Sequence, residues 1–166
     1  MPAEQTFAEC VSTPFGVFQI EATEAGLSAI RFPKRFIRRP SKTEIPKHAK
    51  FHLRAGKIFL TRFYSRVHGS QQRVSIDWHL FRPFEKRVLK TLMKVPAGSI
   101  VTYGELACRS GSRGAARAVG NALHRNPLPL VIPCHRVIRS DKSLGGFQSG
   151  IRWKRKLLRW EGRDII

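Results

Sequence analysis

Two short helical segments separated by a glycine constrain the fold of this chain more than any other feature of its sequence. The run Thr102-Tyr103-Gly104-Glu105 has the spacing of a capping box, which predicts a helix from Thr102 to about Arg109. Gly111 then turns the chain, and a second helix is predicted from about Gly114 to His124, ended by Asn126-Pro127. Two helices in this order match a helix-turn-helix, whose second helix enters a groove of DNA.

The second helix carries mostly small residues, which leave its backbone nearly bare. A helix with this surface can approach even a narrow groove closely, and only Arg117, Asn121 and His124 could reach base edges. Recognition of a particular base sequence is therefore not expected. The alternative interpretation is that the small residues permit tight helix packing inside the protein.

The charge of the chain favours a polyanionic partner. Its 166 residues include 31 Lys and Arg against 11 Asp and Glu, a net charge of +20. Nucleic acid is the first candidate, because neutralising phosphates releases counterions. A membrane surface is the competing polyanion, but the sequence has no apolar stretch of spanning length, so no membrane association is expected. Solubility alone is the remaining explanation.

The cysteine content predicts a reducing compartment. Cys10, Cys108 and Cys134 are odd in number and widely separated, which suits neither a disulfide framework nor a metal site, so we expect no metal. The first residues do not have the pattern of a signal peptide. We therefore expect a cytoplasmic protein, or a nuclear one if the source is eukaryotic.

The N-terminal part reads as a strand meander followed by a helix. Strands are predicted at 11–12, 17–22 and 27–32, with a turn at Thr13-Pro14-Phe15-Gly16. A basic connector that we expect to be mobile follows at 34–47, and it contains two prolines. Next comes an amphipathic helix whose predicted apolar face consists of Phe51, Ala55, Ile58, Phe59 and Phe63.

The pattern changes near Asp77-Trp78-His79, where we place a boundary between domains at 1–78 and 79–166. A helix should begin at Pro83 and bury Phe84, Val88, Leu92 and Val95. A last helix at 151–161 should bury Trp153, Leu157 and Trp160 and present Lys154, Arg155, Lys156 and Arg159 on its other side.

Cys134 and His135 combine a nucleophile with the side chain that most often serves as its base. A cysteine at neutral pH is only a few per cent thiolate, so a nearby base or positive field is enough to activate it. On this pair alone, a small buried cysteine beside an uninvolved histidine is the simpler interpretation.

Several motifs together resemble the O6-alkylguanine-DNA alkyltransferases, also called methylated-DNA-protein-cysteine methyltransferases. The resemblance rests on Pro133-Cys134-His135-Arg136-Val137, Arg117-Ala118-Val119-Gly120, Asn126-Pro127, Thr102-Tyr103-Gly104-Glu105 and Glu161-Gly162, and on their mutual spacing. It covers the chain from about residue 74 to the end, and the N-terminal strands look like the family's first part.

The resemblance implies an α/β (α+β) fold. A small N-terminal sheet-plus-helix domain, similar to ribonuclease H, would precede a helical C-terminal domain with a winged-helix-like helix-turn-helix. It also implies a monomer that needs no cofactor and acts on double-stranded DNA containing alkylated guanine.

The implied activity is DNA repair by a single-turnover methylated-DNA-[protein]-cysteine S-methyltransferase. After the nucleotide is flipped through the minor groove, the alkyl group of O6-alkylguanine moves irreversibly to Cys134, with O4-alkylthymine as a second candidate substrate. By the same resemblance, His135 takes the thiol proton through a bridging water and Glu161 orients the imidazole. Asn126 braces the turn that carries the thiol, and Tyr103 donates a hydrogen bond to the departing guanine.

The resemblance also assigns residues to the DNA and to the base. Arg117 would occupy the place that the flipped nucleotide leaves, and the DNA-binding set would be completed by Ala115, Ala116, Ala118, Gly120 and Asn121. The substrate pocket would comprise Leu123, Pro129, Val137, Phe147 and Gln148. Phe147 stands where some members have tyrosine, which preserves stacking and removes a hydroxyl.

Three other functions fit parts of the sequence. A DNA-binding module that marks lesions without repairing them is one, although such relatives lack the cysteine that Cys134 provides here. A cysteine hydrolase would use Cys134 and His135 but needs an oxyanion hole that no motif supplies. A transcription regulator would need a helix that reads a specific operator.

Overall fold

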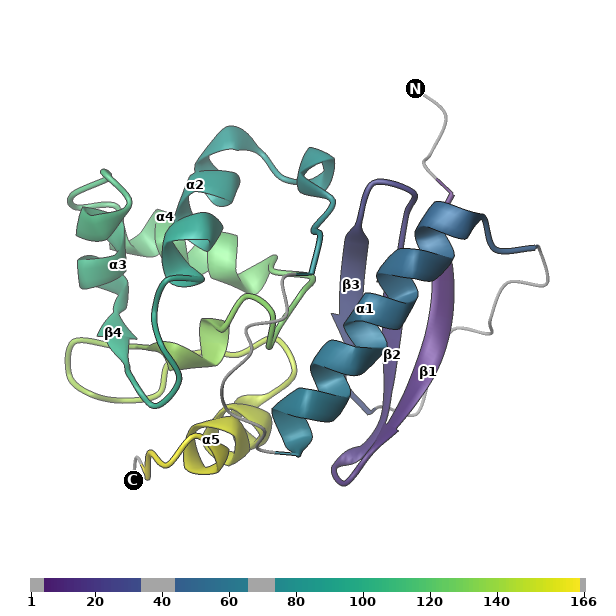
Figure 1. Ribbon diagram of the computed structural model, residues 1–166. Coiled ribbons are helices and arrows are strands. Elements are labelled where there is room, and N and C mark those ends of the chain that lie inside the picture. Colours follow the sequence, from purple (N-terminus) through teal and green to yellow (C-terminus); the bar gives the residue numbers. More distant parts are fainter. Residues whose placement is uncertain (1–4, 34–43, 66–73, 165–166) are drawn as a thin grey trace. The chain divides into compact units, whose positions relative to one another are not determined.

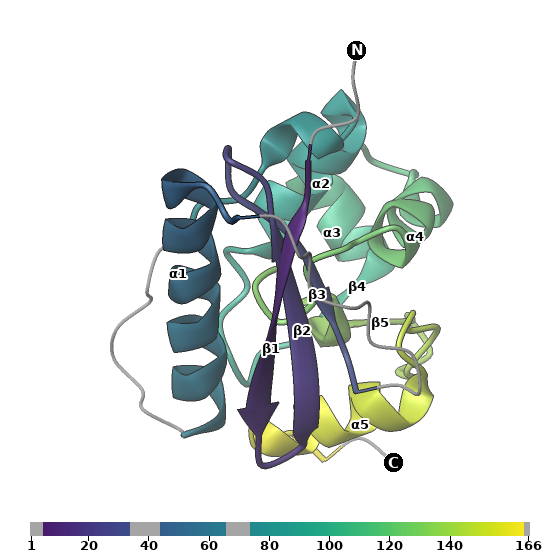
Figure 2. The ribbon, with the colours of Figure 1, turned by 90° about the vertical axis from the view of Figure 1, so that its right-hand side faces the viewer.

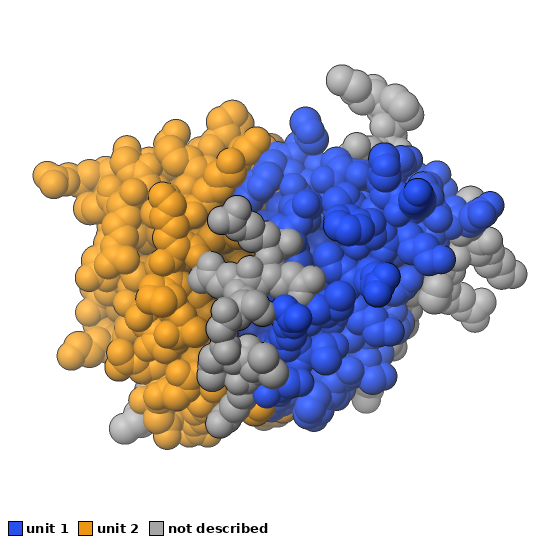
Figure 3. Space-filling model, viewed as in Figure 1, with its two compact units in different colours: residues 1–80 blue, residues 81–166 orange. Residues whose placement is uncertain are grey.

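The structure is a computed structural model that describes residues 5–33, 44–65 and 74–164. The chain divides into two compact units, residues 1–80 and 81–166, which Figure 3 shows in different colours. The division predicted from the sequence, between 78 and 79, lies close to it. The first unit combines a small sheet with one long helix, and the second is mainly helical, as the predicted fold class requires.

The first unit is built on an antiparallel sheet. Strands β1 (Phe7–Thr13), β2 (Gly16–Ala22) and β3 (Leu27–Arg31) lie in the order β1-β2-β3. The turn between the first two is held by Thr13, whose hydroxyl donates to the carbonyl of Gly16 at 2.8 Å. The meander predicted from the sequence is therefore confirmed.

Helix α1 (Lys47–Tyr64) covers one face of this sheet, as Figure 2 shows. The predicted apolar face was wrong, because Phe51 is 67% exposed and the positions at 55, 58, 59 and 63 are only half-buried. The helix instead buries Ala49, Leu53, Gly56, Leu60 and Tyr64.

Close packing explains the rotated face of α1. A Cβ atom at Gly56 would lie 3.0 Å from Cδ2 of Leu27, so the helix backbone lies directly against the sheet. Small and aliphatic side chains fit this contact, whereas the aromatic rings of Phe59 and Phe63 pack against each other, with centroids 6.3 Å apart, beside it. The connector predicted to be mobile falls mainly on residues 34–43, which lie outside the described residues.

The second unit contains all the elements that carry the candidate site (Figure 1). In order, these are α2 (Pro83–Leu92), β4 (Val101–Thr102), α3 (Tyr103–Arg109), α4 (Ala116–His124), β5 (Val137–Ile138) and α5 (Ile151–Trp160), with a 3-10 turn at Cys134–Arg136 before β5. Helix α2 begins at Pro83, as predicted. It buries Val88 and Leu92, and Phe84 is half-buried.

Helices α3 and α4 form the helix-turn-helix that the sequence predicts. The backbone N–H of Glu105 donates to the Thr102 hydroxyl at 3.1 Å, and the N–H of Thr102 donates to the Glu105 carboxylate at 2.6 Å, so the capping box is confirmed. Helix α4 buries Val119, Ala122 and Leu123. Its opposite side, which includes Arg117 and Asn121, is exposed.

A short parallel ladder joins the start of α3 to the chain after Cys134. Val101 pairs with Val137 and Thr102 with Ile138, which links β4 to β5. Because Tyr103 directly follows β4 and the Cys134–Arg136 turn directly precedes β5, this ladder fixes the helix-turn-helix relative to the cysteine.

Helix α5 differs from its prediction at one important position. Lys154 is 0% exposed, although the sequence placed it on the solvent side, while Trp153 and Trp160 are only half-buried. Leu157 is buried as predicted, together with Leu158. The reason is that the Lys154 ammonium finds backbone carbonyls inside the protein, so its charge is not left without partners. Of the helices in the described part of the chain, none is long and apolar enough to cross a bilayer.

Candidate active site

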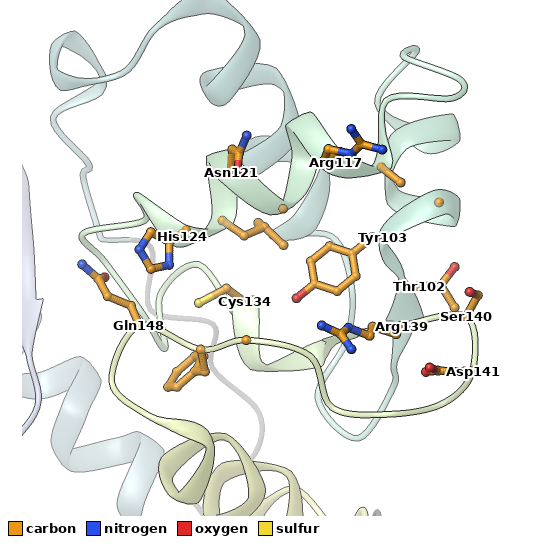
Figure 4. Close-up of a pocket in the computed structure, with 16 residues that line it drawn as sticks. Thr102, Tyr103, Arg117, Asn121, His124, Cys134, Arg139, Ser140, Asp141 and Gln148 are labelled. Carbon is orange, nitrogen blue, oxygen red and sulfur yellow. The ribbon is translucent and has the colours of Figure 1, made fainter.

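Cys134 opens the 3-10 turn and lines a pocket of about 640 Å³. Its backbone N–H donates to the carbonyl of Ile132 at 2.8 Å, which tightens the chain just before the turn. The residue is only 8% exposed, so little of it besides its pocket-lining surface can meet water. Figure 4 shows it between α4, which carries Arg117 and Asn121, and the loop that carries Gln148. This volume is typical of pockets that hold small molecules.

Asn126 holds the segment that carries the thiol. Its side-chain amide donates to the sulfur of Cys134 at 3.2 Å and to the carbonyl of Ile132 at 3.0 Å, and its oxygen accepts from the N–H of Leu128 at 3.0 Å. Asn126 is 1% exposed, so these bonds are shielded from water. Asn126 thus lies beside Cys134, where the sequence analysis expects it to brace the turn that carries the thiol.

The environment of the thiol combines burial with two groups that favour ionisation. Burial raises the pKa of Cys134 to about 11, and the hydrogen bond from Asn126 and the positive charge of Lys154 act in the opposite direction. In this structure the sulfur is therefore protonated at neutral pH. A base is needed to take the proton during a reaction.

His135 and Glu161 provide the elements of such a base. The imidazole Nε2 lies 3.0 Å from the Glu161 carboxylate, and the histidine is completely buried. Burial opposes the negative charge of Glu161, but hydrogen bonds from His135 and Arg136 outweigh it and lower the pKa of Glu161 to about 2. The carboxylate is therefore ionised, and it accepts a hydrogen bond from the protonated Nε2 of His135.

Arg136 holds the same carboxylate with two of its nitrogens. Its Nη2 lies 2.6 Å and its Nε 2.9 Å from the two oxygens of Glu161, and its Nη1 donates to the carbonyl of Val95 at 2.5 Å. The N–H of Gly98 also donates to the Glu161 carboxylate, at 3.3 Å, so this carboxylate accepts from His135, from two nitrogens of Arg136 and from Gly98. Glu161 is thus fixed from several sides and can hold the imidazole in one orientation.

The second nitrogen of His135 is the one that can act on the thiol. Burial lowers the pKa of His135, so the ring is neutral at pH 7, and with Nε2–H bound to Glu161 its Nδ1 is a proton acceptor. This Nδ1 is buried and has no hydrogen-bond partner among the described residues. It is therefore available as a proton acceptor.

The other walls of the pocket come from the helix-turn-helix and from the loop after β5. Tyr103, at the start of α3, lies beside α4, where a Cβ on Gly120 would be 3.8 Å from its ring. Burial and the neighbouring Cys134 raise the pKa of Tyr103, so its hydroxyl keeps its proton and can donate it in a hydrogen bond. Of the residues predicted to form the substrate pocket, Leu123, Phe147 and Gln148 line it. The residues predicted to contact DNA that also line it are Ala116, Arg117, Gly120 and Asn121.

Two residues predicted for the substrate pocket, Pro129 and Val137, do not line it. Both are buried, and the Val137 carbonyl already accepts a hydrogen bond from Lys154. Ala115 and Ala118, which were predicted to contact DNA, also lie outside the lining. Sequence reasoning also missed residues. Nothing in the sequence set Lys154 apart from its exposed basic neighbours, whereas Arg136 stands in the same short motif as the cysteine and could have been considered.

Comparisons with known proteins identify the family of the chain. Residues 83–163 match the family described as 6-O-methylguanine DNA methyltransferase, DNA binding domain. The chain is 52% identical over 82 residues to a methylated-DNA–protein-cysteine methyltransferase of Methanothermobacter thermautotrophicus, an alignment that covers 49% of the chain and 46% of that relative. The chain thus spans about half the length of this relative.

Two further similarities extend over both units. A methylated-DNA–protein-cysteine methyltransferase of Methanosarcina barkeri is 32% identical over 163 residues, which cover 96% of this chain and 99% of that protein. The crystal structure of a Mycobacterium tuberculosis OGT in complex with DNA is similar with a TM-score of 0.74 and 30% identity, covering 93% of this chain and 91% of that one. On this evidence of sequence, fold and site, the chain belongs to the methylated-DNA–protein-cysteine methyltransferase family.

Proposed function

We propose that the protein repairs DNA by moving an alkyl group from the O6 atom of guanine to the sulfur of Cys134. The observation that carries this proposal is a thiol that lines a pocket large enough for a base, next in the chain to a buried imidazole that is held by an ionised carboxylate. Membership of the family supports the same reaction. The partner is double-stranded DNA with an alkylated guanine, the protein acts as a monomer, and its place of action is the cytoplasm, or the nucleus in a eukaryote.

The first step is extrusion of the damaged nucleotide. An alkyl group on O6 lies in the base-pairing edge inside the stack, so the thiol cannot reach it until the nucleotide rotates out. Helix α4 presents small side chains toward the DNA, and Arg117 is exposed on it at the rim of the pocket (Figure 4). Arg117 would enter the stack and pair with the orphaned base, which stabilises the extruded state.

The second step is transfer. The Cys134 proton passes through a bridging water to Nδ1 of His135, and the resulting imidazolium is stabilised by Glu161. The sulfur forms a bond to the alkyl carbon while the bond from that carbon to O6 breaks, and its electron pair stays on the guanine. Tyr103 donates a hydrogen bond to the guanine as this charge develops. The guanine anion then takes up one proton from water, and the imidazolium of His135 returns to water the proton that it took from the thiol.

The product explains why each molecule would act once. A thioether has no leaving group that water can displace under physiological conditions, and no residue of the described pocket is placed to remove the alkyl group again. The protein is consumed in a one-to-one ratio with the lesions that it repairs.

The test is a mass measurement on protein mixed with duplex DNA that contains O6-methylguanine. The peptide that contains Cys134 should gain one methyl group in proportion to the guanine restored, and Cys134→Ala should show neither change. Cys108→Ala, which removes an exposed cysteine of α3, is the matched control and should react normally. Repaired DNA together with unmodified protein would contradict the proposal, and binding to methylated DNA without transfer would instead identify a module that marks lesions.

A further inference from the structure

Lys154 is a completely buried lysine whose charge favours ionisation of Cys134 but which has no part in the steps described above. It lies on α5, and its ammonium donates hydrogen bonds to three backbone carbonyls: those of Val137 at 2.5 Å, Leu144, and Gly146 at 3.4 Å. A lysine is almost never buried unless its charge has partners, and here every partner is a carbonyl oxygen. The three carbonyl oxygens therefore form a binding site for a cationic hydrogen-bond donor.

The three carbonyls belong to two different segments of the chain, of which one lines the pocket. Val137 begins β5 and is joined to Cys134 by the short 3-10 turn. Leu144 and Gly146 lie in the loop on the other side, where Gly146 and the two residues after it line the pocket. One side chain thus connects the strand that follows the nucleophile to the loop against which an extruded base would rest.

The same connection reaches Tyr103. Gly145 lies between the two loop carbonyls, and a Cβ atom at this position would be 3.0 Å from the Tyr103 hydroxyl. The Lys154 ammonium also lies over the Tyr103 ring, 5.9 Å from its centroid. A displacement of the loop would therefore move the wall that confines the phenol.

We propose that Lys154 is a positioning residue for alkyl transfer, which fastens the loop at 144–146 to β5 and so fixes the distance between the base and the thiol. This role rests on the proposed function. Lys154 carries its charge at neutral pH, because burial lowers its pKa only to about 8. An uncharged side chain of similar length would leave all three carbonyls without their donor and release the loop.

Two substitutions test this role. Lys154→Met keeps the length of the side chain and removes the donors, and Lys154→Arg keeps the charge but places its donors differently. Lys156→Met changes an exposed lysine of the same helix and is the matched control. Each protein is compared with the wild type for the rate of methyl transfer at saturating methylated duplex, for affinity toward undamaged duplex, and for hydrogen–deuterium exchange of residues 143–149.

Lys154→Met should transfer the methyl group at least tenfold more slowly and exchange the loop amides at least tenfold faster. Its affinity for undamaged duplex should stay within twofold of the wild type, because α4 is not touched. Lys154→Arg should lose at least threefold in rate, and Lys156→Met should behave as the wild type in all three measurements.

A wild-type rate together with wild-type exchange in whichever Lys154 variant folds would overturn the proposal. If Lys154→Met does not fold, Lys154→Arg decides alone, by the same two measurements. If the wild-type protein itself transfers no methyl group, the proposed function fails, while the exchange of the loop still shows whether Lys154 holds it.

Discussion

Replacing Glu161 by glutamine should destabilise the protein through loss of a single charge. Glutamine keeps the shape of the side chain but cannot hold His135 and Arg136 as an anion does. The carboxylate side chain is 4% exposed and accepts from both residues, so little water is present to compensate. The substitution should therefore lower the free energy of unfolding, which can be measured without an assay of repair.

The size of the loss follows from the pKa of Glu161, about 2 in the folded protein against an ordinary value of 4.5. Each tenfold change in proton affinity corresponds to about 1.4 kcal/mol, so the ionised form contributes about 3 kcal/mol at pH 7. Because the folded pKa is the lower one, this contribution is complete above about pH 5 and is lost as the pH falls from there toward 2.

Urea unfolding of the wild type and of Glu161→Gln at several pH values measures this contribution. The two proteins should differ by about 3 kcal/mol at pH 7 and by much less near pH 2, where the wild-type carboxylate is protonated. Acid also increases the repulsion among the many positive charges, but this affects both proteins and cancels in the difference. A gap below about 1 kcal/mol at pH 7, or a gap that does not change with pH, would refute the assignment of the anion as the main contributor.

Two further predictions concern DNA. Arg117→Ala should slow transfer from duplex DNA at least tenfold but leave the reaction with free O6-benzylguanine within twofold of the wild type, since only the duplex requires extrusion. If the rates with the two substrates fall equally, Arg117 does not have that role. The affinity for duplex DNA, measured by fluorescence anisotropy, should fall at least about a hundredfold between about 50 and 200 mM salt if about four phosphates are neutralised. An affinity that does not change with salt would show that the basic surface does not contact the DNA.

Local signals in the sequence predicted much of the fold. The capping box at Thr102, the proline that begins α2 and the alternation in the first strands each depend on neighbouring residues, and the structure confirms all three. The buried face of α1 could not be found in the same way. Its rotation is set by how closely Gly56 approaches Leu27, a contact between distant residues in which the small side chain matters more than the aromatic ones.

The candidate site shows the same limit. Cys134 and His135 are adjacent in the sequence, and the roles of His135, Asn126 and Glu161 were predicted from the family resemblance. In the structure Asn126 donates to the sulfur of Cys134, and His135 is hydrogen-bonded to Glu161, 26 residues further along the chain. The position of Lys154 could not be predicted. A lysine among four basic neighbours normally faces water, and only the tertiary structure supplies carbonyls that make burial acceptable.

The ladder between β4 and β5 has a consequence for how this protein tolerates change. The phenol of Tyr103 and the sulfur of Cys134 are held in common register by main-chain pairing, and the identity of the side chains in those two strands contributes little to it. Apolar substitutions at Val101, Val137 and Ile138 can accumulate over evolution, whereas the hydroxyl of Thr102 is still needed to cap α3. A single inserted or deleted residue between Val101 and Tyr103, in contrast, would shift the phenol along the ladder and disable the chemistry even in a protein that still folds.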